Sequence, residues 1–362
     1  VALAGARALC GPRSATPPFL SGPLPAVPSE PVELDQLVRF FAHPVRAFLR
    51  QRLGVSLGTS ADELAEALPI ELDPLEHWAL GQRLLEARLA GADPRSSVAA
   101  EVARGALPPG ALAGPILERV GRVVEDLVRE AGALVPMSAT SSPVDVHPVD
   151  IHLLLPGGRL LVGTVPDVAD GMLRSVTFSR VGPRHRLGSW VRFLAVCAAR
   201  PDERFEAVTL GRARPGRGRA FVTVARLTLP GDGLLEGTEL GRQFALDRLI
   251  DLVDLYDRGM GQAPPLYCKT SAAYAEAAAL GHDPRAAARL AWETTHNFAN
   301  EDRDLEHQLV HGGILSIGDL LAPLPDSDEA GQGWNAEETS RVGRYSRRLW
   351  DPLLSVERVT DR

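Results

Sequence analysis

The sequence predicts an α/β fold in which a mixed β-sheet, from about residue 134 to 230, is flanked by helices from residues 34–131 and 233–352. In the middle region, apolar and polar residues alternate over short runs separated by turn residues, which is the pattern of strands. On both sides of it, apolar residues recur at helical spacing. A chain of 362 residues with 45% apolar content can bury a sizeable core. We therefore expect one α/β domain over residues 34–352.

We expect no catalytic residues at either end of the chain. Residues 1–33 contain several prolines that prevent helix formation, so this segment is expected to be a linker or the tail of a preceding domain. Its opening includes Arg7 and Arg13 within an apolar stretch and no initiator methionine, which indicates an internal fragment rather than a signal peptide. Residues 353–362 are expected to form a C-terminal tail. No run of about 18 uncharged apolar residues occurs, so no membrane span is expected.

The flanking helices have recognisable starts and breaks. Leu34–Leu53 is apolar at helical spacing on both sides of His43-Pro44, so two helical pieces with a break between them are expected. Asp73-Pro74 is typical of a helix start and predicts a helix over Leu75–Leu89. Further helices are predicted at Leu112–Ala131, Arg184–Ala199, Glu239–Arg258, Ser271–Leu280, Pro284–His296 and Thr339–Trp350.

Three aspartates share one face of the predicted helix Glu239–Arg258: Asp247, Asp251 and Asp254. Acids at this spacing generally form a solvated face. Because no lysine is interleaved with them, they could also meet a basic partner.

The sheet region divides into two hairpins and a connecting helix. Strands are predicted at Val144–Leu155, Arg159–Val168 and Leu173–Val181, with turns between them. A further hairpin is predicted over Glu206–Leu229, because β-branched residues stand on both sides of the turn sequence Arg-Pro-Gly-Arg-Gly-Arg at residues 214–219.

Arginine is concentrated in the sheet region. Residues 171–230 contain twelve arginines and three acids, although the net charge of the chain is −7. Such asymmetry is typical of a basic face for phosphate groups on an acidic body. A biased composition is the plainer explanation, since Lys269 is the only lysine, and a solvated hairpin is the alternative for the arginines near the turn. The residues expected to contact DNA are Arg184, Arg186, Arg212, Arg214, Arg217 and Arg219.

Neither a metal site nor a P-loop is predicted. Four alternating residues of the first strand share a face: Asp145, His147, Asp150 and His152. Such residues usually mark the solvated face of an edge strand. The three cysteines are widely spaced and odd in number, which argues for reduced thiols in the cytoplasm. The sequence G-x-x-x-x-G-K-[ST] does not occur.

The stretch Leu160–Ala199 has the layout of a nuclease active site without the residues that perform the chemistry. In two-metal nucleases of the PD-(D/E)xK type, one strand ends in a metal-binding Asp, and the next carries Asp/Glu-x-Lys to hold Mg²⁺ and orient water. The corresponding positions here are Pro166, with Asp167 one residue late, and Thr177 and Ser179. We therefore expect a degenerate PD-(D/E)xK, restriction-endonuclease-like sheet with no catalytic residue and no metal of its own.

Several blocks of this region together resemble the C-terminal region of the RecC family, the gamma subunit of exodeoxyribonuclease V (RecBCD). They are Gly163-Thr-Val-Pro-Asp-Val, Gly171-Met-Leu-Arg and Ser189-Trp-Val-Arg-Phe-Leu-Ala-Val-Cys-Ala, and weaker similarity extends from about Leu34 to the C-terminus. The resemblance implies an inactive nuclease-like domain. His43 stands where iron–sulfur relatives have the Cys of Cys-Pro-x-x-Phe, and without a later cysteine group it is expected to be structural.

The resemblance also implies a function. The chain would be a non-catalytic DNA-handling and scaffold region of the RecBCD helicase–nuclease, acting in double-strand break processing and recombinational repair. Its partners would be RecB-like and RecD-like subunits, double-stranded DNA ends and unwound single strands, while Mg²⁺ and ATP would belong to the partner subunits. The Chi-reading residues of this family lie largely in its helicase-like part, so none is assigned here.

Two other functions remain open at this point. One is an active Mg²⁺-dependent nuclease that uses Asp145, Asp150 or Asp167 in a migrated arrangement. The other is a protein-binding scaffold that makes no contact with DNA. Cleavage by the purified protein would indicate the first, and salt-dependent DNA binding would exclude the second.

Overall fold

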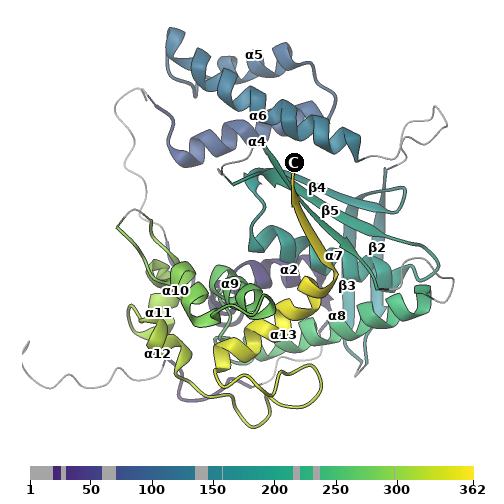
Figure 1. Cartoon of the computed structure of the whole chain (residues 1–362), viewed down its shortest axis with the longest axis vertical. Helices are drawn as coiled ribbons and strands as arrows, with labels where there is room; N and C mark the ends of the chain where they lie inside the picture. Colours follow the sequence, from purple (N-terminus) through teal and green to yellow (C-terminus); the bar gives the residue numbers. More distant parts are fainter. Residues whose placement is uncertain are drawn as a thin grey trace, which may run out of the picture.

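A computed structural model describes residues 19–25, 30–58, 71–134, 146–156, 158–214, 221–230, 237–296 and 298–362. Its central element is a seven-stranded mixed sheet with helices packed on both faces (Figure 1). The predicted α/β architecture, a mixed sheet flanked by helices, is confirmed. The strands are β1 (Val32–Glu33), β2 (Val146–Leu154), β3 (Leu160–Ala169), β4 (Met172–Arg180), β5 (Glu206–Arg212), β6 (Val222–Thr228) and β7 (Glu357–Asp361).

The order of strands along the sheet is β1-β3-β4-β5-β6-β7, and β2 pairs with β3. The pairs β1/β3 and β4/β5 are parallel, and the other pairs are antiparallel. Parallel neighbours cannot be joined by a tight turn and need a crossover. Helix α7 (Pro183–Ala199) provides it between β4 and β5.

The helices form two layers, one on each face of the sheet (Figure 1). One layer contains α4 (Pro74–Leu89), α5 (Pro94–Arg104), the 3₁₀ turn η2 (Gly110–Leu112) and α6 (Ala113–Ala133). The other contains α2 (Leu34–Ala42), α3 (Pro44–Ala47), the π-helical turn η1 (Phe48–Arg52), α7, α8 (Gly237–Gly261), α9 (Cys268–Ala279), α10 (Pro284–Trp292), the 3₁₀ turn η3 (Glu301–Arg303), α11 (Leu305–His311), α12 (Ile317–Leu321) and α13 (Arg341–Val356). None of the helices described is long and apolar enough to cross a bilayer.

Each face of the sheet has its own apolar core, because successive strand residues point to opposite sides. In β5, Val208 and Leu210 pack with Leu84 of α4 and Val124 of α6. Ala207, which directly precedes Val208 and points to the opposite side, belongs to the other core, which is built around α2, α7 and α8. The helical block expected over residues 34–131 is thus divided between the two layers.

The predicted helix start at Asp73-Pro74 and the predicted break at His43-Pro44 are confirmed, whereas α9 begins at Cys268 and not at Ser271, α10 ends at Trp292 and not at His296, and α13 extends to Val356 and not to Trp350. The Asp73 carboxylate accepts a hydrogen bond from Glu76 N at 2.7 Å, while the Glu76 carboxylate accepts one from Asp73 N at 2.9 Å, which forms a capping box ahead of α4. The break between α2 and α3 falls at His43, whose Nδ1 accepts a hydrogen bond from Arg46 N at 3.1 Å. Pro44 follows at the first position of α3.

The C-terminal residues differ from the expected tail. Residues 353–362 complete α13 and then form β7, which pairs with β6 as an edge strand. Glu357, at the start of β7, is ion-paired with the buried Arg186 of α7. This long-range pair is invisible in the local sequence, where residues 357–361 show only a weak strand pattern.

The acidic face of α8 is turned toward the protein. Asp251 and Asp254 both form ion pairs with Arg348 of α13, whose side chain is 6% exposed. The basic partner that the spacing of these aspartates allowed is therefore a residue of the same chain. Asp247 accepts a hydrogen bond from the Gln243 amide.

Helix α4 comes close to the sheet at Gly81. A Cβ at this position would lie 2.2 Å from the ring of Phe178 in β4, whereas a Cβ at Gly121 of α6 would meet no atom within 4 Å. We predict that Gly81→Ala destabilises the fold by about 1–3 kcal/mol through overpacking. Gly121→Ala, which improves helix propensity at an open position, should stabilise it by about 0.5–1 kcal/mol. Urea unfolding of both variants measures the contrast, and equal effects would show that the contact between α4 and β4 is not tight.

Candidate functional site

The strands β3 and β4 separate soon after the turn that joins them. Their recorded pairing is limited to Val168 with Leu173 and Ala169 with Met172. On the same side of β3, β1 pairs only with Leu161 and Val162. In the described part of the chain, residues 163–167 of β3 therefore have no strand partner on this side, and the N-terminus of α2 approaches Gly163 instead.

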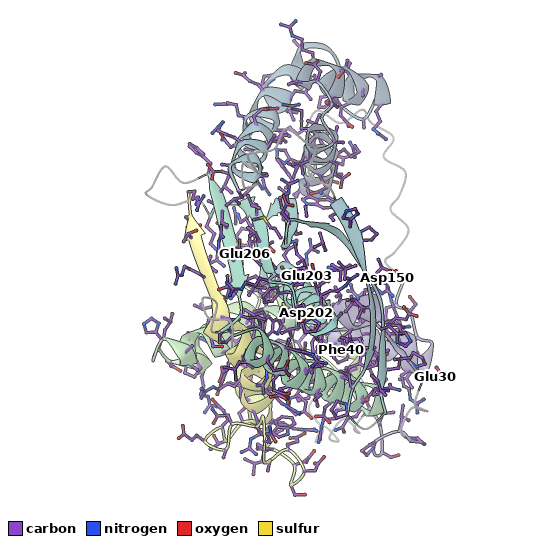
Figure 2. All side chains as sticks on the ribbon, turned by 90° about the vertical axis from the view of Figure 1, so that its right-hand side faces the viewer. Glu30, Phe40, Asp150, Asp202, Glu203 and Glu206 are labelled. Carbon is purple, nitrogen blue, oxygen red and sulfur yellow. The ribbon has the colours of Figure 1, made fainter. Side chains whose placement is uncertain are left out.

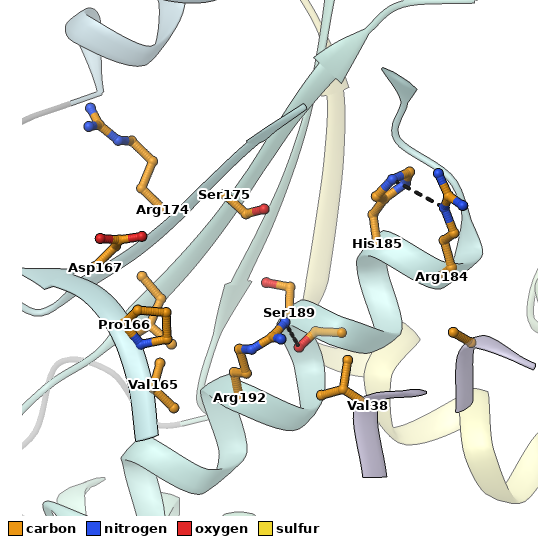
Figure 3. A pocket seen from close by; sticks show the side chains of 13 residues that line it. Val38, Val165, Pro166, Asp167, Arg174, Ser175, Arg184, His185, Ser189 and Arg192 are labelled. Carbon is orange, nitrogen blue, oxygen red and sulfur yellow. Dashed lines mark hydrogen bonds between the residues drawn. The ribbon is translucent and has the colours of Figure 1, made fainter. Parts of the chain in front are cut away.

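This separation opens a hollow of about 410 Å³ between β3, β4 and α7, which we call the strand-gap pocket (Figure 3). Helix α7 contributes a single stripe, because residues three, four and seven apart share a face. The stripe contains His185, Gly188, Ser189 and Arg192. The strands contribute Val165, Pro166, Asp167, Leu173, Arg174 and Ser175, while Val38, Ala42 and Arg184 complete the lining.

The structure brings together only half of the predicted nuclease positions. Pro166 and Asp167 line the strand-gap pocket, but Thr177 and Ser179 do not. Thr177 is buried beside Gln82 of α4, and Ser179 Oγ accepts a hydrogen bond from the Trp78 indole N–H at 2.8 Å. These two residues therefore do not lie opposite Asp167 in the pocket.

The tight turn between the strands explains this arrangement. Because Val168 pairs with Leu173, the next residue level with Asp167 is Arg174, so the side chains nearest to Asp167 come from the start of β4. Figure 3 shows Asp167 and Arg174 on the strand side of the pocket and Arg184, His185 and Arg192 on α7. Sequence reasoning missed Arg174, Ser175 and Arg192, although counting back from the turn at residues 169–171 would have indicated the first two.

The donor set of the strand-gap pocket fits an anion better than a divalent cation. Asp167 is the only carboxylate among its lining residues, and three guanidinium groups accompany it. A Mg²⁺ site uses one or two carboxylates and is weakened by neighbouring positive charge. Asp167 also has φ 58°, a left-handed conformation that Asp adopts more readily than most residues. Burial lowers the pKa of His185 to about 4, so its ring adds no charge at neutral pH.

A second feature lies beside this pocket, at the carboxyl ends of the parallel strands β4 and β5. Arg180 and Arg212 are register partners there, Arg184 lies in the first turn of α7, and Arg214 follows β5. We call these four residues the arginine edge. In the part of the chain that the structure describes, no carboxylate lies within ion-pair distance of any of them.

The three acids of residues 171–230 lie at the opposite end of β5. Figure 2 shows Asp202, Glu203 and Glu206 in the loop before β5 and at its first residue. Glu203 pairs with Arg200, and Glu206 pairs with Arg226. The positive charge of the arginine edge is therefore not neutralised locally. The Arg212 guanidinium is half-buried over the Phe178 ring, at 4.5 Å from its centroid, and burial, followed by the charge of Arg180, lowers its pKa.

The arginines expected to contact DNA have different environments. Arg184 and Arg214 are exposed, whereas Arg186 is buried, stacked over Trp350 and ion-paired with Glu276 and Glu357. Because its guanidinium is occupied by two carboxylates, we remove Arg186 from the DNA-contacting set. Arg217 and Arg219 lie outside the described residues.

His43 is part of a hydrogen-bonded group with Asp304 and His307. Its Nε2 lies 3.0 Å from Asp304 Oδ2, and the ligand atoms of the three residues lie within 4.8 Å of one another. Since His43 Nδ1 accepts from Arg46 N, the proton of the neutral ring is on Nε2 and is donated to Asp304. A metal at Nε2 would have to displace this proton and leave neither ring nitrogen protonated, so these residues fit a structural contact between α3 and α11 better.

The four alternating Asp and His residues of the first predicted strand were weighed as a metal site. Among them, Asp150 accepts a hydrogen bond from the Thr164 hydroxyl at 2.7 Å. His152 is exposed on the same strand, opposite Val162 of β3. Asp145 lies outside the described residues. These contacts fit the solvated face of an edge strand.

Comparison with known proteins identifies the family. Residues 29–279 match the family model of the RecC C-terminal domain. The chain belongs to the RecC family. It is 37% identical over 358 residues to the RecBCD enzyme subunit RecC of Mycolicibacterium smegmatis, which covers 99% of this chain and 30% of that protein. This RecC membership confirms the resemblance carried by the motifs around Gly163, Gly171 and Ser189.

More distant RecC proteins show the same relation. The RecBCD enzyme subunit RecC of Mycobacterium tuberculosis H37Rv is 33% identical over 356 residues, with 98% of this chain and 30% of that protein covered. The Escherichia coli K12 RecC subunit is 29% identical over 239 residues, with 66% of this chain and 19% of that protein covered. The chain thus spans about 30% of the length of the mycobacterial relatives.

Two neighbouring arginines of α7 test the division between structural and exposed charges. Arg186→Met would leave Glu357, whose side chain is 2% exposed, as an uncompensated buried charge. We predict a loss of about 3–5 kcal/mol in the free energy of unfolding, most of it recovered by adding Glu357→Leu. Arg184→Met should change stability by no more than about 0.5 kcal/mol. Urea unfolding of the three variants is the measurement. If Arg186→Met lowers the free energy of unfolding only slightly, Arg186 would again be a candidate for DNA contact.

Proposed function

We propose that this chain is the non-catalytic, DNA-handling part of a RecBCD-type helicase–nuclease that processes double-strand breaks for recombinational repair. Membership of the RecC family supports the assignment to such a complex. The observation that carries the non-catalytic part is the strand-gap pocket. At the place where a nuclease would hold its metal ions, it has one carboxylate among three arginines.

We further propose that the sheet is a degenerate PD-(D/E)xK nuclease fold. Its support is the order β3–β4–α7, with Asp167 where the strands separate and α7 packed beneath them. On the second strand the pocket is lined by Arg174 and Ser175, and neither is an acid or a lysine. The only lysine of the chain, Lys269, lies on α9 and does not line this pocket.

The arginine edge is the proposed DNA contact. Guanidinium groups match the geometry of phosphate oxygens, and unpaired ones at the carboxyl ends of parallel strands are placed to bind an anionic ligand. Arg180, Arg184 and Arg214 are exposed and have no carboxylate partner in the described residues. Contacts of this kind position the DNA backbone without reading its sequence.

The proposed partners are RecB-like and RecD-like subunits, together with duplex DNA ends and the single strands unwound from them. The relatives are named as subunits of the RecBCD enzyme, which supports the assembly. Mg²⁺ and ATP are proposed to act on those partner subunits.

The DNA contact is tested by removing three exposed charges. In the full-length protein, Arg180→Gln/Arg184→Gln/Arg214→Gln should reduce the magnitude of the negative slope of log K against log salt by about 2–3 units on duplex DNA, because each phosphate contact contributes about −0.9 to that slope. The discrimination between base sequences should not change. A matched control is Arg50→Gln/Arg95→Gln/Arg122→Gln, which removes three exposed arginines of η1, α5 and α6. If both triple variants keep the original slope, the protein-binding scaffold becomes the better explanation.

The absence of catalysis is tested at Asp167. We expect Asp167→Ala to leave the nuclease activity of a reconstituted complex unchanged, because a single carboxylate without a second acid and a lysine cannot hold the metal ions and orient water. The measurement is Mg²⁺-dependent cleavage by the complex and by the purified subunit. Cleavage by the subunit alone that Asp167→Ala abolishes would instead establish the active nuclease.

A further inference from the structure

A second and larger hollow, of about 670 Å³, lies on the other side of Arg184 and His185. It is enclosed by the end of β4, the N-terminal turns of α7 and α9, the region of α3, and residues 299–307. We call it the α7–α9 pocket. It shares Ala42, Arg184 and His185 with the strand-gap pocket, so the two hollows adjoin.

Positive charge dominates its lining. Five cationic side chains face two carboxylates: Arg46, Arg180, Arg184, Lys269 and Arg303 against Glu301 and Asp304.

Both carboxylates are already committed to local structure. Glu301 accepts hydrogen bonds from Lys269 N at 2.9 Å and from Thr270 N and Oγ1 at 2.8 Å, which caps α9. Asp304 caps α11 with one oxygen and accepts from His43 with the other. Hydrogen bonding to His43 and its neighbours holds the pKa of Asp304 well below its usual range despite burial, so the group stays ionised.

The cations are less well compensated than the acids. Arg46 is bound to Glu306, but in the described part of the chain Arg180, Arg184 and Lys269 have no carboxylate within ion-pair distance. Arg303 has only a long contact, 3.8 Å, with its neighbour Asp302. Four cations from four different elements therefore converge on one hollow with little neutralisation.

One of these cations stands where a helix disfavours it. Arg184 is in the first turn of α7, which contains no acid, whereas Lys269, in the first turn of α9, lies beside the Glu301 carboxylate that caps this helix. The positive end of the helix dipole raises the free energy of a cation at that place. Lysine is otherwise absent from the chain, which uses arginine for every other basic position. Local rules broken in this way tend to mark a functional site.

We propose that the α7–α9 pocket is a phosphate-binding site, with Lys269 and Arg303 on one wall and Arg180 and Arg184 on the other. A phosphate group would relieve the repulsion among the four cations and accept hydrogen bonds from the guanidinium forks and the ammonium group. The proposal deepens the proposed DNA-handling function, because Arg180 and Arg184 belong to both the pocket and the arginine edge. The phosphate comes from a DNA strand or from a free nucleotide.

The other groups of the pocket are inert toward such a ligand. Burial raises the pKa of the Cys268 thiol to about 12, so it remains protonated and is not a nucleophile at neutral pH. His43 donates to Asp304 and His185 is neutral. The pocket therefore holds the phosphate without reacting with it.

The test uses Lys269→Gln/Arg303→Gln, which touches the α7–α9 pocket and spares the arginine edge. Thermal unfolding of the full-length protein is measured in inorganic phosphate and in chloride at equal ionic strength, then with a nucleoside triphosphate and with a single-stranded oligonucleotide. We expect the phosphate-bearing ligands to raise Tm of the wild-type protein, with oligonucleotide binding weakened at least tenfold in the variant.

The control Arg95→Gln/Arg122→Gln makes the same change in net charge elsewhere and accounts for the general effect of phosphate on stability. Lys269→Arg, which keeps the charge, should retain binding.

The outcomes separate this proposal from the proposed function. If the variant and its control respond alike to every ligand, the α7–α9 pocket is not a phosphate site, whether or not the arginine-edge variant loses DNA binding. If inorganic phosphate or the nucleotide stabilises the wild type and not the variant, while the oligonucleotide binds neither, the pocket is confirmed with a free phosphate compound as its ligand. The DNA-handling function then fails if the duplex titration also shows no change for the arginine-edge variant. Weakened oligonucleotide binding in the variant confirms the pocket with a DNA strand as the source.

Discussion

The parallel pairing of β4 and β5 is the constraint on which the candidate site depends. Parallel neighbours require a crossover, and α7 provides it while burying Trp190, Val191 and Phe193 in the larger core. The helix must start next to the carboxyl ends of both strands. This one connection therefore places the first turn of α7 beside Arg180 and Arg212, and it forms a wall of both pockets.

The same frame can serve catalysis or binding, depending on a few side chains. The separation of β3 and β4 creates a hollow whatever residues line it, because the hairpin pairs over only two positions. Carboxylates and a lysine there would hold metal ions, whereas Arg174, Ser175 and Arg192 give a surface that favours anions. The side chains that line the hollow, and not its shape, therefore set the sign of its charge.

Much of the architecture could be predicted because it follows from residues that are close together in the sequence. Helix α4 follows from Asp73-Pro74, and the break at His43 follows from Pro44. The site was harder, because it depends on distant residues. Arg184 and Arg186 look alike in the sequence. Only Arg186 is buried, where it forms an ion pair with Glu357, a residue far along the chain. Likewise, Asp254 forms an ion pair with the distant Arg348, and Thr177 contacts the distant Gln82.

The distribution of charge matters more here than its total. The chain carries a net charge of −7, yet a ligand senses mainly the charges within about 8 Å at physiological salt. Many arginines outside the site are paired with acids, as Arg88 is with Glu125 and Arg341 with Glu329. At the arginine edge no carboxylate of the described residues lies within ion-pair distance, and the two carboxylates that line the α7–α9 pocket are engaged as helix caps. An acidic protein can therefore present a positive surface to a phosphate backbone, and the pairing of each arginine reveals this where composition alone does not.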